Sequence, residues 1–355
     1  MSNPDPSDPP STISILTINV WFGLEERGVL KMSPLEPPGR AETRYQILTT
    51  ELRALQPDFI AVQEANPIPR YSQRLARELG YDEIHQVYNG GIKIGSLGIP
   101  LNLKMGLVLL AKRQFHLKSA GARQISGDRL AVYRDCLCFH FTDSRWVMAG
   151  TASVGGRKLF ILHTHTYAGP SGSPEILHAL DRCRERREIS EKAYQRYMIR
   201  FQRTARRQKN EVERILHYLK ETCGGEPALL VGDFNLAEDN ALMGWLIREG
   251  GLWDTYRMAN PGRKGITWDA DHNENTKWLG GLFSIPEQQR GPAYHVRAAY
   301  DRQSRKIDYI FLNSAFRKNH ILESRIVLEQ PVGGVHASDH YGVMSIVSLP
   351  PEQRP

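Results

Sequence analysis

Polar side chains suited to phosphate chemistry stand at the ends of six apolar segments of this sequence. Any one of them could be a turn residue, because Asn and Asp beside strands commonly are. Together they combine acids, amides and histidines: Asn19, Gln63-Glu64, His163-Thr164-His165, Asp233-Phe234-Asn235, Asp308 and Ser338-Asp339-His340. Strand ends in a packed sheet converge on one rim, so the pattern predicts a single site built from distant parts of the chain.

The residue types suit metal-assisted hydrolysis of a phosphate ester. Carboxylate and amide oxygens are the ligands that Mg²⁺ or Mn²⁺ prefers. A histidine beside a carboxylate can accept a proton from water near pH 7, and a second histidine can donate to a phosphoryl oxygen. The sequence has no Cys/His cluster for zinc, no GxxxxGK[ST] loop and no GxSxG elbow, which argues against three other classes of hydrolase.

Apolar runs typical of buried strands precede or follow these residues. A helix is expected at 41–55, between the first two strands, and another at 240–249, after the sixth. One long helical pattern covers 188–221. The expected strands are 13–20, 59–63, 106–110, 146–154, 159–164, 228–232, 307–312 and 342–347.

The segments LTINV, QPDFIAVQE, HTH, LLVGDFN, KIDYIFL and SDHYGV resemble, in this order, those of the endonuclease/exonuclease/phosphatase superfamily. The resemblance covers roughly residues 13–348. It implies an α/β fold of the DNase I-like class, a four-layer αββα sandwich of two mixed β-sheets flanked by helices. We expect a single domain over 12–348 with a basic helical insertion at about 167–203, and tails at 1–11 and 349–355.

The resemblance also implies roles for individual residues. Asn19 and Glu64 would hold Mg²⁺ (or Mn²⁺), with Asp339 as a further ligand. His165 would contact the phosphate, and Asp233 and Asn235 would orient the attacking water. His340 would be the general base, oriented by Asp308. The expected reaction is in-line attack of water on phosphorus. The expected substrate is a phosphodiester in preference to a monoester.

The substrate class stays open at this level. Trp21 stands where DNA-repair members of the superfamily carry an acid, and Thr267-Trp268-Asp269 followed by Asn273 resembles neutral sphingomyelinases, with Trp268 and Asn273 as substrate contacts. A lipid substrate is therefore slightly preferred. A nuclease or tyrosyl-DNA phosphodiesterase is the alternative, because similar TWD elements occur there. A catalytically silent anion-binding module is the third hypothesis.

The positive charge of the chain is concentrated in one segment. The net charge is +7, and residues 182–209 contribute eleven Lys/Arg against three acids, so the remainder is close to neutral. This segment is expected to contact an anionic membrane or nucleic acid. No 20-residue apolar run predicts a membrane span, and the four cysteines form no disulfide framework, so a cytoplasmic location is expected.

Overall fold

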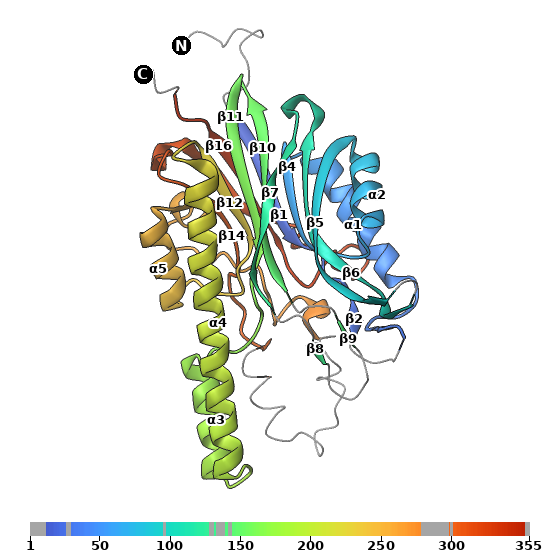
Figure 1. Ribbon diagram of the computed structural model, residues 1–355, viewed down its shortest axis with the longest axis vertical. Coiled ribbons are helices and arrows are strands. Elements are labelled where there is room, and N and C mark those ends of the chain that lie inside the picture. The colour runs from blue at the N-terminus through green and yellow to red at the C-terminus, as the bar shows by residue number, and fades with distance from the viewer. Residues whose placement is uncertain are drawn as a thin grey trace.

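Two β-sheets packed face to face form the body of the protein (Figure 1). The computed structural model describes residues 12–25, 30–94, 97–127, 131–132, 139–140, 144–277, 298 and 301–351, without the side chains of 25, 92–94, 97–100, 131–132 and 139–140. The first sheet has the order β15 (Ile321–Val327), β16 (Gly342–Ser348), β1 (Thr12–Asn19), β4 (Phe59–Ala65), β6 (Leu97–Lys112), β5 (Tyr81–Ile94), β9 (Phe139–His140) and β8 (Ala131–Val132). The second has the order β13 (Trp253–Asp254), β14 (Asp308–Leu312), β12 (Ala228–Asp233), β11 (Arg157–His165), β10 (Arg145–Val154) and β7 (Lys118–Ser126).

Both sheets are mixed. β1 pairs with β4 in parallel and with β16 antiparallel, and β11 pairs with β12 in parallel and with β10 antiparallel. A short ribbon joins β2 (Leu24–Glu25) to β3 (Ser33–Pro34). The helices are α1 (Arg40–Leu55), α2 (Arg70–Leu79), α3 (Pro174–Glu185), α4 (Glu191–Cys223), α5 (Ala241–Gly250) and α6 (Thr255–Ala259), with 3₁₀ turns η1 (Arg113–Phe115) and η4 (Lys318–His320).

Three apolar layers hold the sandwich together. The inner layer lies between the sheets and includes Ile15 and Phe59 from the first sheet and Ile161 and Val231 from the second. α1 and α2 cover the outer face of the first sheet, and α4 and α5 cover that of the second. This arrangement confirms the four-layer αββα sandwich of the DNase I-like fold.

The helical pattern predicted at 188–221 corresponds to α4, whereas the helix that precedes it in the insertion was not predicted. The chain forms α3, turns at 186–190 and then continues in the 33-residue α4. The turn requires a left-handed backbone at Arg187, with φ of 58°, which a helical pattern in the sequence does not reveal. α3 and the first half of α4 project beyond the sheets as a hairpin (Figure 1). No helix in the described part of the chain is long and apolar enough to cross a membrane.

Candidate active site

Strand alternation brings the candidate residues to one place between the sheets. Side chains two apart on a strand share a face. Asn19 follows Ile13 and Ile15 on the inner face of β1, and Asp233 follows Leu229 and Val231 on that of β12. The same parity aims His165 inward from the end of β11 and Asp308 from the start of β14. The two sheets meet here, since Nδ2 of Asn19 donates to Oδ2 of Asp233 at 3.1 Å.

Glu64 reaches this inner site only because its strand is irregular. By parity it would share the outer face with Ile60 and Val62, which pack against the helices. The pairing of β4 with β6 shifts register after Val62, and Glu64 has a left-handed φ of 59°. Such a bulge redirects a side chain. Oε1 of Glu64 consequently lies 3.9 Å from Nε2 of His165, and Oε2 accepts the backbone N–H of Phe22 at 3.2 Å.

The Gly-Asp-Phe-Asn segment makes a tight turn beneath the site. Gly232 has φ of 140°, and a Cβ here would overlap the carbonyl oxygen of Thr164 on the neighbouring strand, so the position requires glycine. Asn235 adopts a left-handed φ of 49°, which Asn tolerates. Its backbone N–H donates to Oδ1 of Asp233 at 2.8 Å, and its Nδ2 donates to the carbonyl of Thr166 at 3.1 Å. The turn therefore fixes both Asp233 and Asn235.

His340 and Asp308 form a buried pair. Nδ1 of His340 lies 2.9 Å from Oδ2 of Asp308, and its Nε2 lies 3.8 Å from Oδ2 of Asp233. Burial favours the neutral ring, but the carboxylates of Asp308, Asp233 and Asp339 outweigh it and raise the pKa of His340 to about 10. His340 is therefore an imidazolium at neutral pH, and Trp268 packs edge-on against it at a centroid distance of 5.1 Å.

His165 is held as a neutral ring. Nη1 of Arg145 lies 3.3 Å from Nδ1 of His165, and the hydroxyl of Tyr88 lies 3.0 Å from the same atom. Burial, followed by the positive charge of Arg145, lowers the pKa of His165 well below its usual range. Because a guanidinium can only donate, Nδ1 must accept, and the proton resides on Nε2. That atom faces the site, 3.5 Å from Oδ2 of Asp233.

The buried carboxylates make this cluster a candidate cation site. Burial and Asp308 raise the pKa of Asp233 to about 7, and burial and Glu64 raise that of Asp339 to about 6. Oδ1 of Asp308 is a buried acceptor that has no hydrogen-bond partner among the described residues. Carboxylate oxygens of Asp233 and Asp308 and a ring nitrogen of His340 lie within 4.8 Å of one another, and His340 as an imidazolium supplies a positive charge there and no ligand atom. The carboxylates and the Asn19 amide supply the oxygen donors that a hard divalent cation takes.

The two predicted substrate contacts lie beneath the surface. Trp268 is only 6% exposed, and its indole N–H donates to the carbonyl of Asp301 at 3.0 Å. Asn273 is fully buried, and its Nδ2 donates to the carbonyl of Ser338 at 2.9 Å while its Oδ1 accepts from the N–H of Asn275. Both residues support the segment that carries Asp339 and His340.

Sequence reasoning missed four residues that position the site. Arg44 is buried against Glu36 at 2.7 Å and donates to the carbonyls of Val20 and Ala337, so it ties the two loops that carry Asn19 and Asp339. No local pattern signals this contact. The other missed residues are Tyr88 and Arg145, which contact His165, and Glu211, which anchors α4. His163 is a buried residue of the core, and its Nε2 lies 2.6 Å from Nε2 of Gln63.

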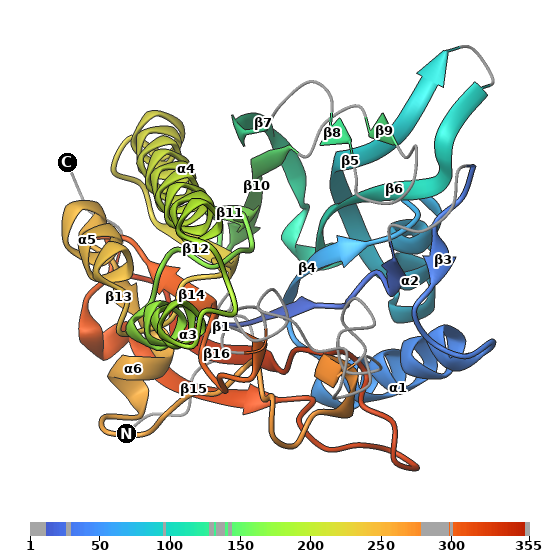
Figure 2. The same cartoon turned by 90° about the horizontal axis from the view of Figure 1, so that it is seen from below.

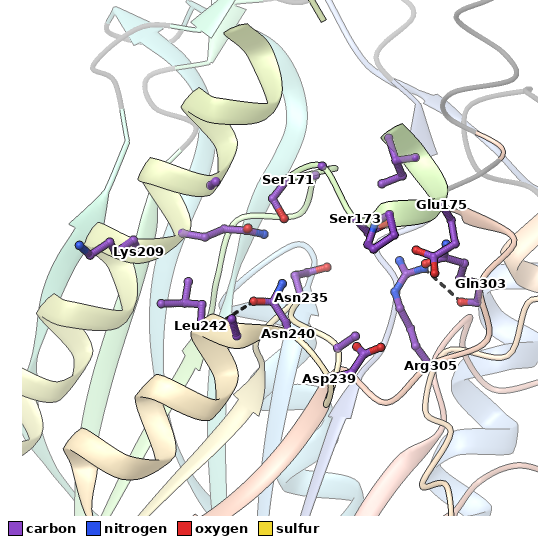
Figure 3. Close-up of a pocket in the computed structure, with 18 of the residues that line it drawn as sticks. Ser171, Ser173, Glu175, Lys209, Asn235, Asp239, Asn240, Leu242, Gln303 and Arg305 are labelled. Carbon is purple, nitrogen blue, oxygen red and sulfur yellow. Dashed lines mark hydrogen bonds between the residues drawn. The ribbon is translucent and has the colours of Figure 1, made fainter. Parts of the chain in front are cut away.

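A cavity of about 920 Å³ adjoins the site on the side of the insertion (Figure 3). Asn235 lies at its inner end. The remaining walls come from the loop before α3, from α4, from the start of α5 and from the segment before β14, and include Ser173, Lys209, Asn240 and Arg305. The guanidinium of Arg305 lies 5.8 Å from the ring of Trp268. The cavity thus gives a substrate room next to Asn235.

Comparisons with known proteins agree with the fold. A family model described as Endonuclease/Exonuclease/phosphatase family matches residues 16–340. Similar solved structures include D. rerio TDP2 complexed with a single-strand DNA product, at 16% identity and a TM-score of 0.56, covering 95% of this chain and 99% of that one. Another is an endonuclease/exonuclease/phosphatase from Bacteroides vulgatus, at 14% identity and a TM-score of 0.56, with the same coverage.

A third similar structure is an endonuclease/exonuclease/phosphatase from Beutenbergia cavernae, at 18% identity and a TM-score of 0.54, covering 95% of this chain and 72% of that one. No curated protein matched the sequence. At these identities the structures establish the fold, whereas the family model spans most of the chain and includes every residue of the cluster from Asn19 to His340. The chain therefore belongs to the Endonuclease/Exonuclease/phosphatase family and is a phosphoric ester hydrolase.

Proposed function

We propose that this protein is a Mg²⁺-dependent phosphodiester hydrolase. The observation that carries the proposal is the convergence of a neutral histidine, an imidazolium and a group of buried carboxylates at one rim, around Asp233. Asn19, Glu64 and Asp339 would hold the cation, because their oxygens suit it and their combined charge needs compensation. The cation would neutralise charge on the phosphoryl oxygens. His340 is not assigned as a ligand, since an imidazolium has no free lone pair.

Asp233 is better suited than His340 to be the general base. A base must arrive without its proton, and His340, with a pKa of about 10, already carries one at neutral pH. Asp233 has a pKa of about 7, which is matched to accepting a proton from water. We therefore revise the predicted roles. Asp233 accepts the proton of the attacking water, Asn235 positions that water, and Asp308 keeps His340 protonated. The imidazolium and the Nε2–H of His165 then stabilise the charge that develops on phosphorus-bound oxygens.

The structure removes part of the basis for preferring a lipid substrate. Trp268, one of the two expected substrate contacts, is buried, so its ring is not presented to a lipid. The DNA product in the similar TDP2 structure supports nucleic acid as the substrate class. We accordingly place a nucleic-acid phosphodiester ahead of sphingomyelin.

Hydrolysis rates on four substrates test this proposal. They are bis(p-nitrophenyl) phosphate, p-nitrophenyl phosphate, a single-stranded oligonucleotide and sphingomyelin, each assayed with Mg²⁺ and with EDTA. We expect Mg²⁺-dependent cleavage of the aryl diester and the oligonucleotide, with slower turnover of the monoester. Preferential cleavage of the monoester, or equal rates in EDTA, would contradict the proposal, and sphingomyelin cleavage without oligonucleotide cleavage would reverse the order of substrates.

A further inference from the structure

The hairpin of α3 and the first half of α4 is an independent projection with a core of its own. Ile176, Leu180 and Phe201 are buried between the two helices, and Tyr194 and Tyr197 pack beside them. Figure 2 is viewed roughly along α4 and shows the hairpin to one side of the two sheets. The hairpin projects from the same end of the sandwich as the site residues. The apolar residues of this segment are therefore used to hold the two helices together, which leaves the basic residues outside.

Exposed cations without an acidic partner form a stripe on α4. Arg184, Arg186 and Lys209 each have a carboxylate within 4.0 Å, so they do not contribute. At 3.6 residues per turn five exposed cations in the first half of this helix fall within a sector of about 120°. The stripe consists of Lys192, Arg196, Arg200, Arg203 and Arg206, all exposed and with no salt bridge to a described residue.

The stripe faces the side of the molecule on which β7 lies. Residues seven apart occupy nearly the same face of a helix. Arg200 is thus aligned with Arg207, which donates to the hydroxyl of Ser126 at the end of β7, and with Arg214, which donates to the carbonyl of Ile125. β10 pairs with this end of β7 and begins at Arg145, the residue that contacts His165. The basic face therefore continues outward from the edge of the active site.

Glu211 fixes the direction of the hairpin relative to the site. This fully buried residue of α4 accepts the N–H of Tyr167, two residues after His165, at 2.7 Å. It also accepts from Ser126 on β7 and from Arg207 on its own helix. A helix held this way at its middle is a rigid mount for the residues that precede it.

We propose that the stripe Lys192–Arg206 binds the phosphate backbone of a nucleic-acid substrate whose scissile phosphate lies at Asp233. This inference rests on the proposed phosphodiesterase function and adds the surface that binds the substrate outside the catalytic cluster. The cations follow one another every three or four residues, about 4.5–6 Å along the helix, and so form an extended row of positive charge that a polynucleotide backbone can follow. A membrane surface fits less well, because Ile199 is the one large apolar residue exposed on the described hairpin, whereas interfacial helices bury a broad apolar face.

Binding of an oligonucleotide by a charge-depleted variant tests the proposal. The variant R196Q/R200Q/R203Q removes three exposed charges and no described side-chain contact. The matched control R77Q/R248Q/K318Q removes three exposed charges elsewhere and has the same net charge. Affinity for a fluorescent single-stranded oligonucleotide of about 20 nucleotides is measured in EDTA across a salt series, and turnover of bis(p-nitrophenyl) phosphate is measured in parallel.

We expect the hairpin variant to lose about 10-fold or more in affinity and to reduce the slope of log K against log salt by about 2, because each lost phosphate contact contributes about 0.7. The control and the turnover of the aryl diester should be unchanged. An equal loss of oligonucleotide affinity in both variants would show that only the net charge matters, and it would overturn the proposal. Unaltered oligonucleotide binding by the hairpin variant would also overturn the proposal, whether or not this variant loses binding to vesicles containing phosphatidylserine. A wild-type enzyme that binds DNA through the hairpin but cleaves no diester would refute the proposed function alone.

Discussion

Nη1 of Arg145 lies 3.3 Å from Nδ1 of His165, and this contact determines which nitrogen of the imidazole carries its proton. An arginine side chain cannot accept a hydrogen bond, so Nδ1 is the acceptor and Nε2–H points at Asp233 and Glu64. The positive charge of Arg145 also disfavours protonation of the His165 ring. The pair therefore presents a neutral donor where the charge of a phosphoryl group would develop.

Replacing Arg145 with Met should lower kcat on an aryl phosphodiester by about 10- to 100-fold with little change in KM. The reason is that the Nε2–H donor of His165 stabilises the transition state more than the bound substrate. R123M is the matched control, since Arg123 pairs with Glu221 on the surface. Nitrogen-15 spectra of the imidazole should show the Nε2–H tautomer of His165 in the wild type and a mixture in R145M. An unchanged tautomer together with unchanged kcat would show that Arg145 is only structural.

The pH dependence of kcat/KM should be bell-shaped. Asp233 must lose its proton to act as base, so activity should rise with pH until about 7, and His340 must keep its proton, so activity should fall above about 10. D233N should lose about 10²–10⁴ in rate and the acid limb, and H340Q should lose the alkaline limb. If H340Q instead removes the acid limb and D233N retains it, His340 is the base.

Stabilisation by Mg²⁺ should increase with pH. The pKa of Asp339 is raised from 3.8 to about 6 in the folded protein, so the folded state binds more protons, and the contribution of Asp339 to stability falls as the pH rises from about 4 to about 6. A cation compensates the charge exposed by that ionisation. The difference in Tm between Mg²⁺ and EDTA should therefore be larger at about pH 8 than at about pH 5, and D339N should reduce this difference. A larger shift at the lower pH would count against the assigned ligands.

Glu211 should be a large contributor to stability at the base of the hairpin. Its two oxygens accept from Tyr167, Ser126 and Arg207, so E211A leaves buried donors unsatisfied and should lower the free energy of unfolding by about 1–3 kcal/mol. E213A, on the exposed side of the same helix, should change it by less than about 0.5 kcal/mol. Chemical denaturation measures the free energy of unfolding of both variants. Equal losses in E211A and E213A would contradict the anchoring role of Glu211.

The regular elements of the sheets could be predicted because their apolar runs are local. The strand at 13–20 was expected from its β-branched residues and lies at Thr12–Asn19. The same alternation explains why Asn19 points inward. Glu64 was expected at the site from its place at a strand end and from family resemblance. Strand parity alone would place it on the outer face, and the left-handed backbone that redirects it has no signature in a single sequence.

Other features depend on contacts between residues distant in sequence, which no local pattern contains. Arg145 meets His165 across paired strands, and Glu211 reaches Tyr167 from the middle of a helix whose amphipathic pattern marks it only as a polar position. Trp268 and Asn273 were assigned to the substrate through family resemblance, and their burial depends on packed loops that a resemblance does not describe. The helix α3 was not predicted, because the left-handed turn at Arg187 that separates it from α4 has no signature in a helical pattern.

The metal-dependent hydrolysis rate of E64Q tests the central claim most directly. Gln keeps the shape of Glu64 and removes the charge proposed to hold the cation, so with bis(p-nitrophenyl) phosphate and Mg²⁺ we expect turnover to fall by about 10³-fold or more, to the level of the wild type in EDTA, with an unchanged circular dichroism spectrum. Wild-type turnover in a folded E64Q variant, still abolished by EDTA, would contradict the assignment of the site.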